Sequence, residues 1–157
     1  MNHLEDIRKI LVGRPVSHVW RGIGSALFLE FGKLTPRTKP DGSSGNNPQG
    51  DITLMIEWSW RIENPRSILT GSWGSEGQWP KAFHTLRHAA VTEVSFFSSL
   101  SELQICLSNG KRITSFMTAE GQPQWAVISR STPRGSWSVK RGVVVFEKGP
   151  ERRYATP

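Results

Sequence analysis

The chain has 157 residues, a single cysteine and a net charge of +7. This length fits one domain that buries a core of its own, and a lone cysteine excludes an intrachain disulfide. No apolar run approaches the ~18 residues that cross a bilayer. We therefore expect a soluble protein, and the free thiol and the absence of a signal peptide favour the cytoplasm.

The positive charge is concentrated near the C-terminus. Residues 1–129 hold 13 Lys and Arg against 11 Asp and Glu, whereas residues 130–157 hold 7 against 2. A basic terminus can bind phosphate groups, although most such termini are solvated tails. We interpret residues 147–157 as a basic tail.

The first predicted element is a short amphipathic helix over residues 2–12. Asn2 is a suitable N-cap, and Glu5 stands three residues later as in a capping box. Gly13 suits the left-handed stop. One face of this helix is apolar and carries Leu4, Ile7, Ile10 and Leu11. Residues 14–20 and 26–31 then alternate as the two strands of a hairpin.

Residues 35–50 are rich in proline, glycine, serine and asparagine and carry no apolar side chain. They cannot contribute to a core. We interpret them as a flexible surface insertion between two strands or, alternatively, as a recognition loop.

The clearest pattern lies in residues 52–63. Every even-numbered residue is apolar, and every odd-numbered residue except Met55 is polar. This period of two predicts one continuous strand with Trp58 and Trp60 facing the interior. Residues 67–69 are predicted to form a short strand, and residues 71–80 a loop with Trp73 and Trp79. These two rings either plug the end of the sheet or offer contact area to a partner.

The second half of the chain resembles the first. The spacing of Val16, Val19, Leu27, Leu29 and Phe31 recurs 75 to 76 residues later in Val91, Val94, Leu103, Ile105 and Leu107. Residues 113–116 and 125–128 stand where the first half has its long strand, and residues 136–140 and 143–146 form a closing hairpin.

We therefore predict a mainly β fold, α+β at the margin, in a single domain over residues 1–157. Its two related β-units, about 13–63 and 88–130, pack as a sandwich or roll into a barrel. The N-terminal helix is the one helix that this prediction contains.

The sequence presents no catalytic, metal or cofactor constellation. Cys106 lies between apolar strand residues with no basic neighbour. His84 and His88 have helical spacing but lack a nearby third ligand. Glu57 and Glu63 are about 20 Å apart along a strand, too far for paired carboxylates. We predict a protein that is not an enzyme and needs no cofactor or metal.

A resemblance suggests a function. The pattern Gly-x-x-Val-x-x-Val, Leu-x-Leu-x-Phe and Trp-x-Ile, followed by residues 58–63 and 68–72, resembles small uncharacterised bacterial β-rich proteins, some of them similar to toxin-immunity proteins. It covers residues 13–130 and implies a module that binds another protein stoichiometrically, with the loops at 35–50 and 71–80 as contact surface. The net charge favours an acidic partner.

The alternative is a nucleic-acid-binding β-barrel that uses the basic C-terminal region. The candidate partner-binding residues are the loop tryptophans and the basic and aromatic residues near the C-terminus, namely Trp73, Trp79, Arg134, Trp137, Lys140 and Arg141. Alanine at Trp73 or Trp79 is predicted to weaken binding more than it lowers stability.

Overall fold

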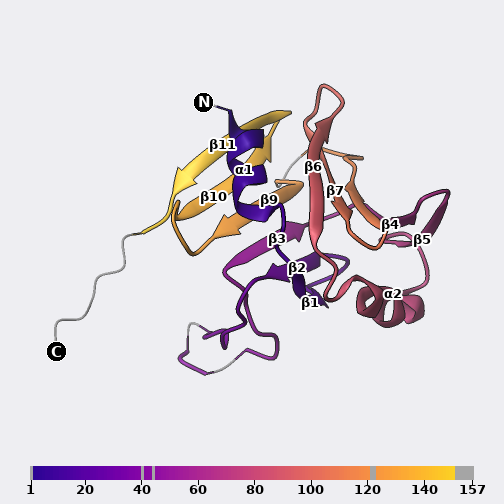
Figure 1. Cartoon of the computed structure of the whole chain (residues 1–157), viewed down its shortest axis with the longest axis horizontal. Helices are drawn as coiled ribbons and strands as arrows, with labels where there is room; N and C mark the ends of the chain where they lie inside the picture. The colour runs from indigo at the N-terminus through magenta and orange to yellow at the C-terminus, as the bar shows by residue number, and fades with distance from the viewer. Residues whose placement is uncertain (1, 40, 44, 121–122, 151–157) are drawn as a thin grey trace.

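The computed structural model describes residues 2–39, 41–43, 45–120 and 123–150. Two antiparallel sheets pack together around one apolar core, with helices at their margins (Figure 1). The predicted mainly β fold is confirmed, and of the two predicted architectures the structure is the sandwich. In the described part of the chain, no helix has the length and apolar character needed to span a membrane.

The chain divides into two similar halves. The first half supplies α1 (His3–Leu11), β1 (Val16–Arg21), β2 (Leu27–Phe31), β3 (Ile52–Ile56), β4 (Trp60–Asn64) and β5 (Ser67–Gly71). The second half follows a 3-10 turn (Glu76–Gln78) and supplies α2 (Trp79–Leu86), β6 (Val91–Phe97), β7 (Glu102–Leu107), β8 (Arg112–Ser115), β9 (Trp125–Ser129), β10 (Gly135–Lys140) and β11 (Val143–Lys148).

The two halves are interlocked. The six-stranded sheet has the order β1-β2-β3-β9-β10-β11, and the five-stranded sheet has the order β5-β4-β8-β7-β6. Each half therefore places three strands in one sheet and then crosses to the other. The junctions β3–β9 and β4–β8 are both antiparallel. Each of the two predicted units therefore contributes strands to both sheets.

Residues 52–63 are two strands and not one. β3 ends at Ile56 and β4 begins at Trp60, and residues 57–59 carry the chain between the sheets. Three connecting residues preserve the alternation, so both Ile56 and Trp60 are buried as predicted. Trp58 lies at the crossing and is 54% exposed. The prediction that Trp58 faces the interior is wrong.

The two helices lie along opposite sides of the sandwich. α1 packs against β6 and β11, and α2 packs against β1 and β5. As predicted, the Asn2 side chain caps α1 by accepting from the backbone N–H of Glu5 at 3.2 Å, and Gly13 has a φ of +89°. α2 was not predicted, because its first residues fall in the expected loop over 71–80. Its apolar face is buried and carries Trp79, Ala82, Phe83 and Leu86.

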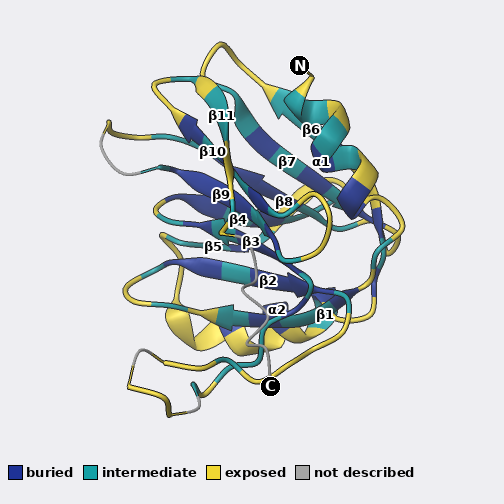
Figure 2. Cartoon of the chain, turned by 90° about the vertical axis from the view of Figure 1, so that its left-hand side faces the viewer, coloured by how far each residue is buried: buried dark blue, intermediate teal, exposed yellow. Residues whose placement is uncertain are grey.

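The closing hairpin of β10 and β11 is present, but β11 continues to Lys148. Glu147 pairs with Ser136 in the sheet, so the predicted basic tail begins later than residue 147. Residues 151–157 of that tail lie outside the described part of the chain. Figure 2 shows β11 to β1 of this sheet running from top to bottom, with buried positions recurring along the strands.

A polar network lies on the outer face of the six-stranded sheet, where the β2–β3 connection begins. Glu30 in β2 is fully buried, and its carboxylate accepts hydrogen bonds from Thr53 Oγ1 and, at 3.0 Å, from Trp20 Nε1. Arg37 of the connection lies 3.7 Å from the same carboxylate. Arg130 donates to Thr53 Oγ1 at 2.8 Å. Burial lowers the pKa of Arg130, and the charge of Glu30 opposes that shift.

Candidate functional site at the crossing of the two halves

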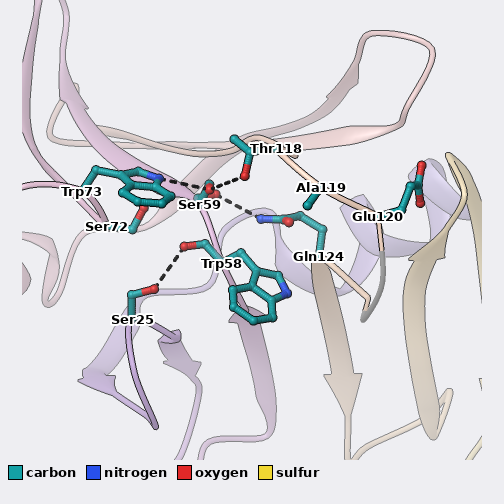
Figure 3. Close-up of a pocket in the computed structure, with 9 residues that line it drawn as sticks. All are labelled: Ser25, Trp58, Ser59, Ser72, Trp73, Thr118, Ala119, Glu120 and Gln124. Atoms are coloured by element: carbon teal, nitrogen blue, oxygen red, sulfur yellow. Dashed lines mark hydrogen bonds between the residues drawn. The ribbon is translucent and has the colours of Figure 1, made fainter.

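Four connections between strands meet around a pocket of about 610 Å³ (Figure 3). The β1–β2 turn contributes one residue, the β3–β4 crossing two, the segment after β5 two, and the β8–β9 crossing four. The lining residues are Ser25, Trp58, Ser59, Ser72, Trp73, Thr118, Ala119, Glu120 and Gln124. The pocket is therefore built where the two interlocked halves pass each other.

Backbone hydrogen bonds hold the two crossing segments together. Glu57 N–H donates to the Gln124 carbonyl at 2.9 Å, and Phe116 N–H donates to the Ser59 carbonyl at 3.1 Å. The β3–β4 crossing is three residues long, so it has little freedom to move away from its partner. The base of the pocket is consequently part of the folded framework.

The floor of the pocket is polar and buried. Ser59 and Gln124 are both buried, and Gln124 Nε2 donates to the Ser59 carbonyl at 3.2 Å. The Ser59 hydroxyl also lies 3.4 Å from Thr118 Oγ1. Buried polar groups need hydrogen-bond partners, and these two satisfy part of each other's demand. The Gln124 amide is thereby held by the Ser59 main chain, and the Ser59 hydroxyl by the neighbouring Thr118 hydroxyl.

Two tryptophans form the aromatic wall. Trp58 is 54% exposed and Trp73 is 80% exposed. The Trp73 ring is tied to the floor, because its Nε1 donates to Ser59 Oγ at 3.2 Å (Figure 3). The main chain of Trp58 is tied to the rim, because Ser25 Oγ donates to its carbonyl at 3.1 Å. Exposed aromatic surface beside a pocket is typical of a binding site.

Of the six candidate residues from the sequence, Trp73 alone lines this pocket. Trp79 is 2% exposed and packs in α2 with its Nε1 donating to the Gly71 carbonyl at 3.0 Å. Trp137 is also 2% exposed and faces the core from β10. Of the two alternatives for the loop tryptophans, Trp79 therefore fits the plug and Trp73 fits the contact surface.

The three basic candidates are not brought together. Arg134 precedes β10, and its Nη1 donates to the Arg130 carbonyl at 3.0 Å. Lys140 ends the same strand and pairs with Glu147 at 3.1 Å. Arg141 is exposed in the β10–β11 turn. The length of β10 (Gly135–Lys140) separates Arg134 from Lys140 and Arg141.

The sequence reasoning missed Trp58, Ser59 and Gln124. The first was assigned to the interior, and the other two carry no motif. The second half contained a usable signal. There, two separate segments, residues 113–116 and 125–128, correspond to the single strand predicted over residues 52–63. Transferring that break to the first half places it between Ile56 and Trp60, which exposes residue 58.

The titratable groups outside the pocket form no competing site among the described residues. There, no cluster of three or more His, Cys, Asp and Glu side chains could hold a metal ion. Burial raises the pKa of the Cys106 thiol above its ordinary value, which disfavours the reactive thiolate. His84 lies in α2, whereas His88 follows the helix with a φ of +73°, so the two do not share a helix face.

Comparison with known proteins gives no match: no family model, characterised protein or solved structure is significantly similar to this chain.

Proposed function

We propose that this protein is a non-enzymatic protein-binding module, of the immunity or accessory type, that seats a side chain of its partner against Trp58 and Trp73. The observation that carries the proposal is the exposure of these two rings above a floor that internal hydrogen bonds already fix. Tryptophan is enriched at the energetic centres of protein interfaces. A preformed site also spares part of the ordering cost of binding.

The size and chemistry of the pocket support binding. Its volume of about 610 Å³ falls in the range of roughly 300–1,000 Å³ typical of ligand sites. Among its described lining residues there is one carboxylate and no histidine, cysteine, lysine or arginine. General acid–base catalysis commonly uses two positioned titratable groups, so these residues favour recognition over chemistry.

The nucleic-acid alternative has less support. It combines stacking rings with basic side chains near the C-terminus, and Trp137 would supply the ring. Because the side chain of Trp137 is enclosed by the core, it presents no face to a base. The exposed tryptophans instead lie at the pocket, where the one charged side chain among the described lining residues is acidic.

The test is a double variant, Trp58→Ala with Trp73→Ala, compared with the parent chain in affinity capture from the native cell, with and without nuclease. We expect the variant to lose the captured protein, with a loss of affinity of about 30-fold for each ring removed, since the loss of a central anchor costs about 2 kcal/mol. Its melting temperature should stay close to that of the parent, because both rings are exposed.

Trp79→Ala is the matched control. Because Trp79 is buried, we expect this variant, contrary to the prediction made from the sequence, to affect mainly stability and to lower the free energy of unfolding by about 3–5 kcal/mol. Capture that survives the double variant, or that nuclease abolishes, would contradict the proposed function.

A further inference from the structure

Most side-chain hydrogen-bond donors of the described lining residues are already used within the protein. Trp73 Nε1 donates to Ser59 Oγ at 3.2 Å, and Gln124 Nε2 donates to the Ser59 carbonyl at 3.2 Å. The Ser25 hydroxyl donates to the Trp58 carbonyl at 3.1 Å, and the Ser72 hydroxyl donates to the Trp60 carbonyl at 3.3 Å. Among the described lining residues, the indole N–H of Trp58 makes no hydrogen bond within the protein, and a ligand meets few other free side-chain donors there.

The acceptors of the same residues remain. An amide carries its carbonyl oxygen opposite its NH₂ group, so Gln124, whose NH₂ group faces Ser59, keeps Oε1 for a second partner. The carboxylate of Glu120 lines the rim and is exposed (Figure 3). Ionised carboxylates only accept hydrogen bonds. The described lining residues thus offer an amide oxygen and a carboxylate as acceptors, with the Trp58 indole N–H as a free donor.

The charge and the aromatic wall point to the same kind of ligand. Glu120 is the one charged residue among the described lining residues, although the whole chain carries +7. The faces of Trp58 and Trp73 are exposed, and a tryptophan face attracts cations through its quadrupole. A donor-rich cation therefore satisfies the floor, the rim and the wall together.

We propose that the pocket binds a lysine or arginine side chain of the partner protein. This inference rests on the proposed function, which makes the ligand part of a protein. The alkyl stem lies along the tryptophan rings, and the ammonium or guanidinium group donates to Gln124 Oε1. The exposed carboxylate of Glu120 at the rim adds its negative charge. The net charge predicts an acidic partner by long-range steering, so the cationic anchor is a local feature of that partner's surface.

The direct test uses short blocked peptides as probes. N-acetyl-Gly-X-Gly-amide, with X as lysine, arginine, norleucine or glutamate, is titrated into the full chain while the indole N–H resonances are followed by NMR. We expect the lysine and arginine peptides to shift the resonances of Trp58 and Trp73, with the norleucine peptide weaker by about fivefold or more. The indole of buried Trp137 serves as the internal control.

Two variants separate charge from shape. Glu120→Gln keeps the size of the side chain and should weaken the lysine peptide several-fold, with a smaller dependence on salt. Glu93→Gln is the matched control, because Glu93 lies beside Arg8 of α1 and does not line the pocket. Norleucine binding as tightly as lysine, or a neutral sugar such as N-acetylglucosamine shifting the two resonances when lysine does not, would overturn the inference.

The failure of this inference is distinguishable from the failure of the proposed function. If the double tryptophan variant loses the captured partner while Glu120→Gln and excess lysine peptide leave capture unchanged, the pocket binds a protein through another side chain, and only the cationic ligand is rejected. If the tryptophan variant retains the partner, the proposed function itself is rejected.

Discussion

Trp60 in the first half of the chain and Trp125 in the second hold equivalent places, each opening the strand that follows a crossing. Trp60 Nε1 donates to the Ser25 carbonyl at 2.6 Å, and Trp125 Nε1 donates to the Ser101 carbonyl at 2.9 Å. Each serine lies in the hairpin turn of its own half. In each half, the indole therefore joins the first strand after the crossing to the turn of that half's first hairpin.

The segments that lead into β1 and β6 show the same correspondence. Gly13 N–H donates to the Val91 carbonyl at 2.8 Å, and His88 N–H donates to the Val16 carbonyl at 2.8 Å. The bridge between Pro15 and Ala90 joins them, and these two residues are 75 positions apart, the offset of the repeat. The halves therefore meet as approximate two-fold partners.

The halves differ most on their outer faces. The first half has 20 residues between β2 and β3, whereas the second has 4 between β7 and β8. Glu30, which is buried in a polar network, corresponds to Cys106 in the second half, since both pair with the strand before them at the same register. The comparison teaches that the inner faces carry the shared framework, while the outer faces accept an insertion and its polar anchor.

The largest expected effect tests the shared framework. Trp60→Ala and Trp125→Ala should each lower the free energy of unfolding by about 3–5 kcal/mol, because each removes a large buried ring. Trp60→Phe and Trp125→Phe, which keep an aromatic ring but remove the indole N–H and part of the buried ring, should each cost about 2 kcal/mol. Urea unfolding measures all four. Equal losses of stability at the two sites would support the equivalence of Trp60 and Trp125. A near-neutral alanine variant at either site would contradict it.

The second prediction tests the outer faces. Glu30→Ala leaves the nearby Arg37 and Arg130 without their buried carboxylate and should cost about 3 kcal/mol. Cys106→Ala, at the corresponding position in the second half, should cost about 1 kcal/mol, since it removes a half-buried thiol. Urea unfolding of both variants gives the difference. If the two costs were the same, the network around Glu30 would not anchor the first half.

The strands and the repeat could be predicted from the sequence because both depend on local alternation and on a fixed offset. The crossing could not, because three connecting residues keep Ile56 and Trp60 on the same parity as one continuous strand would. The pocket depends on that crossing and on residues from four separate connections. No single stretch of sequence contains it, although the loop setting of Trp73 indicated part of it.

The helix α2 was also not predicted, although it occupies the place in the second half that α1 occupies in the first. Shifting residues 3–11 of α1 by the offset of 75 gives residues 78–86, and α2 occupies Trp79–Leu86. The side chains at the corresponding positions differ, with Leu4 matching Trp79 and Arg8 matching Phe83, so hydrophobic spacing alone did not identify the copy. Extending the repeat to its first element would have predicted the helix.

The smallest expected effect concerns the residue with a positive φ that follows each helix. This φ is +89° at Gly13, after α1, and +73° at His88, after α2. A Cβ at Gly13 would meet no atom within 4 Å, so Gly13→Ala should cost about 1 kcal/mol from backbone conformation alone. His88→Gly removes the same penalty and should raise the free energy of unfolding by up to about 1 kcal/mol, because the His88 side chain is exposed. Thermal unfolding of the two variants shows whether Gly13→Ala lowers the stability and His88→Gly raises it. Destabilisation by His88→Gly would mean that the imidazole makes a contact that the first half lacks, and that the two helix ends are equivalent in backbone only.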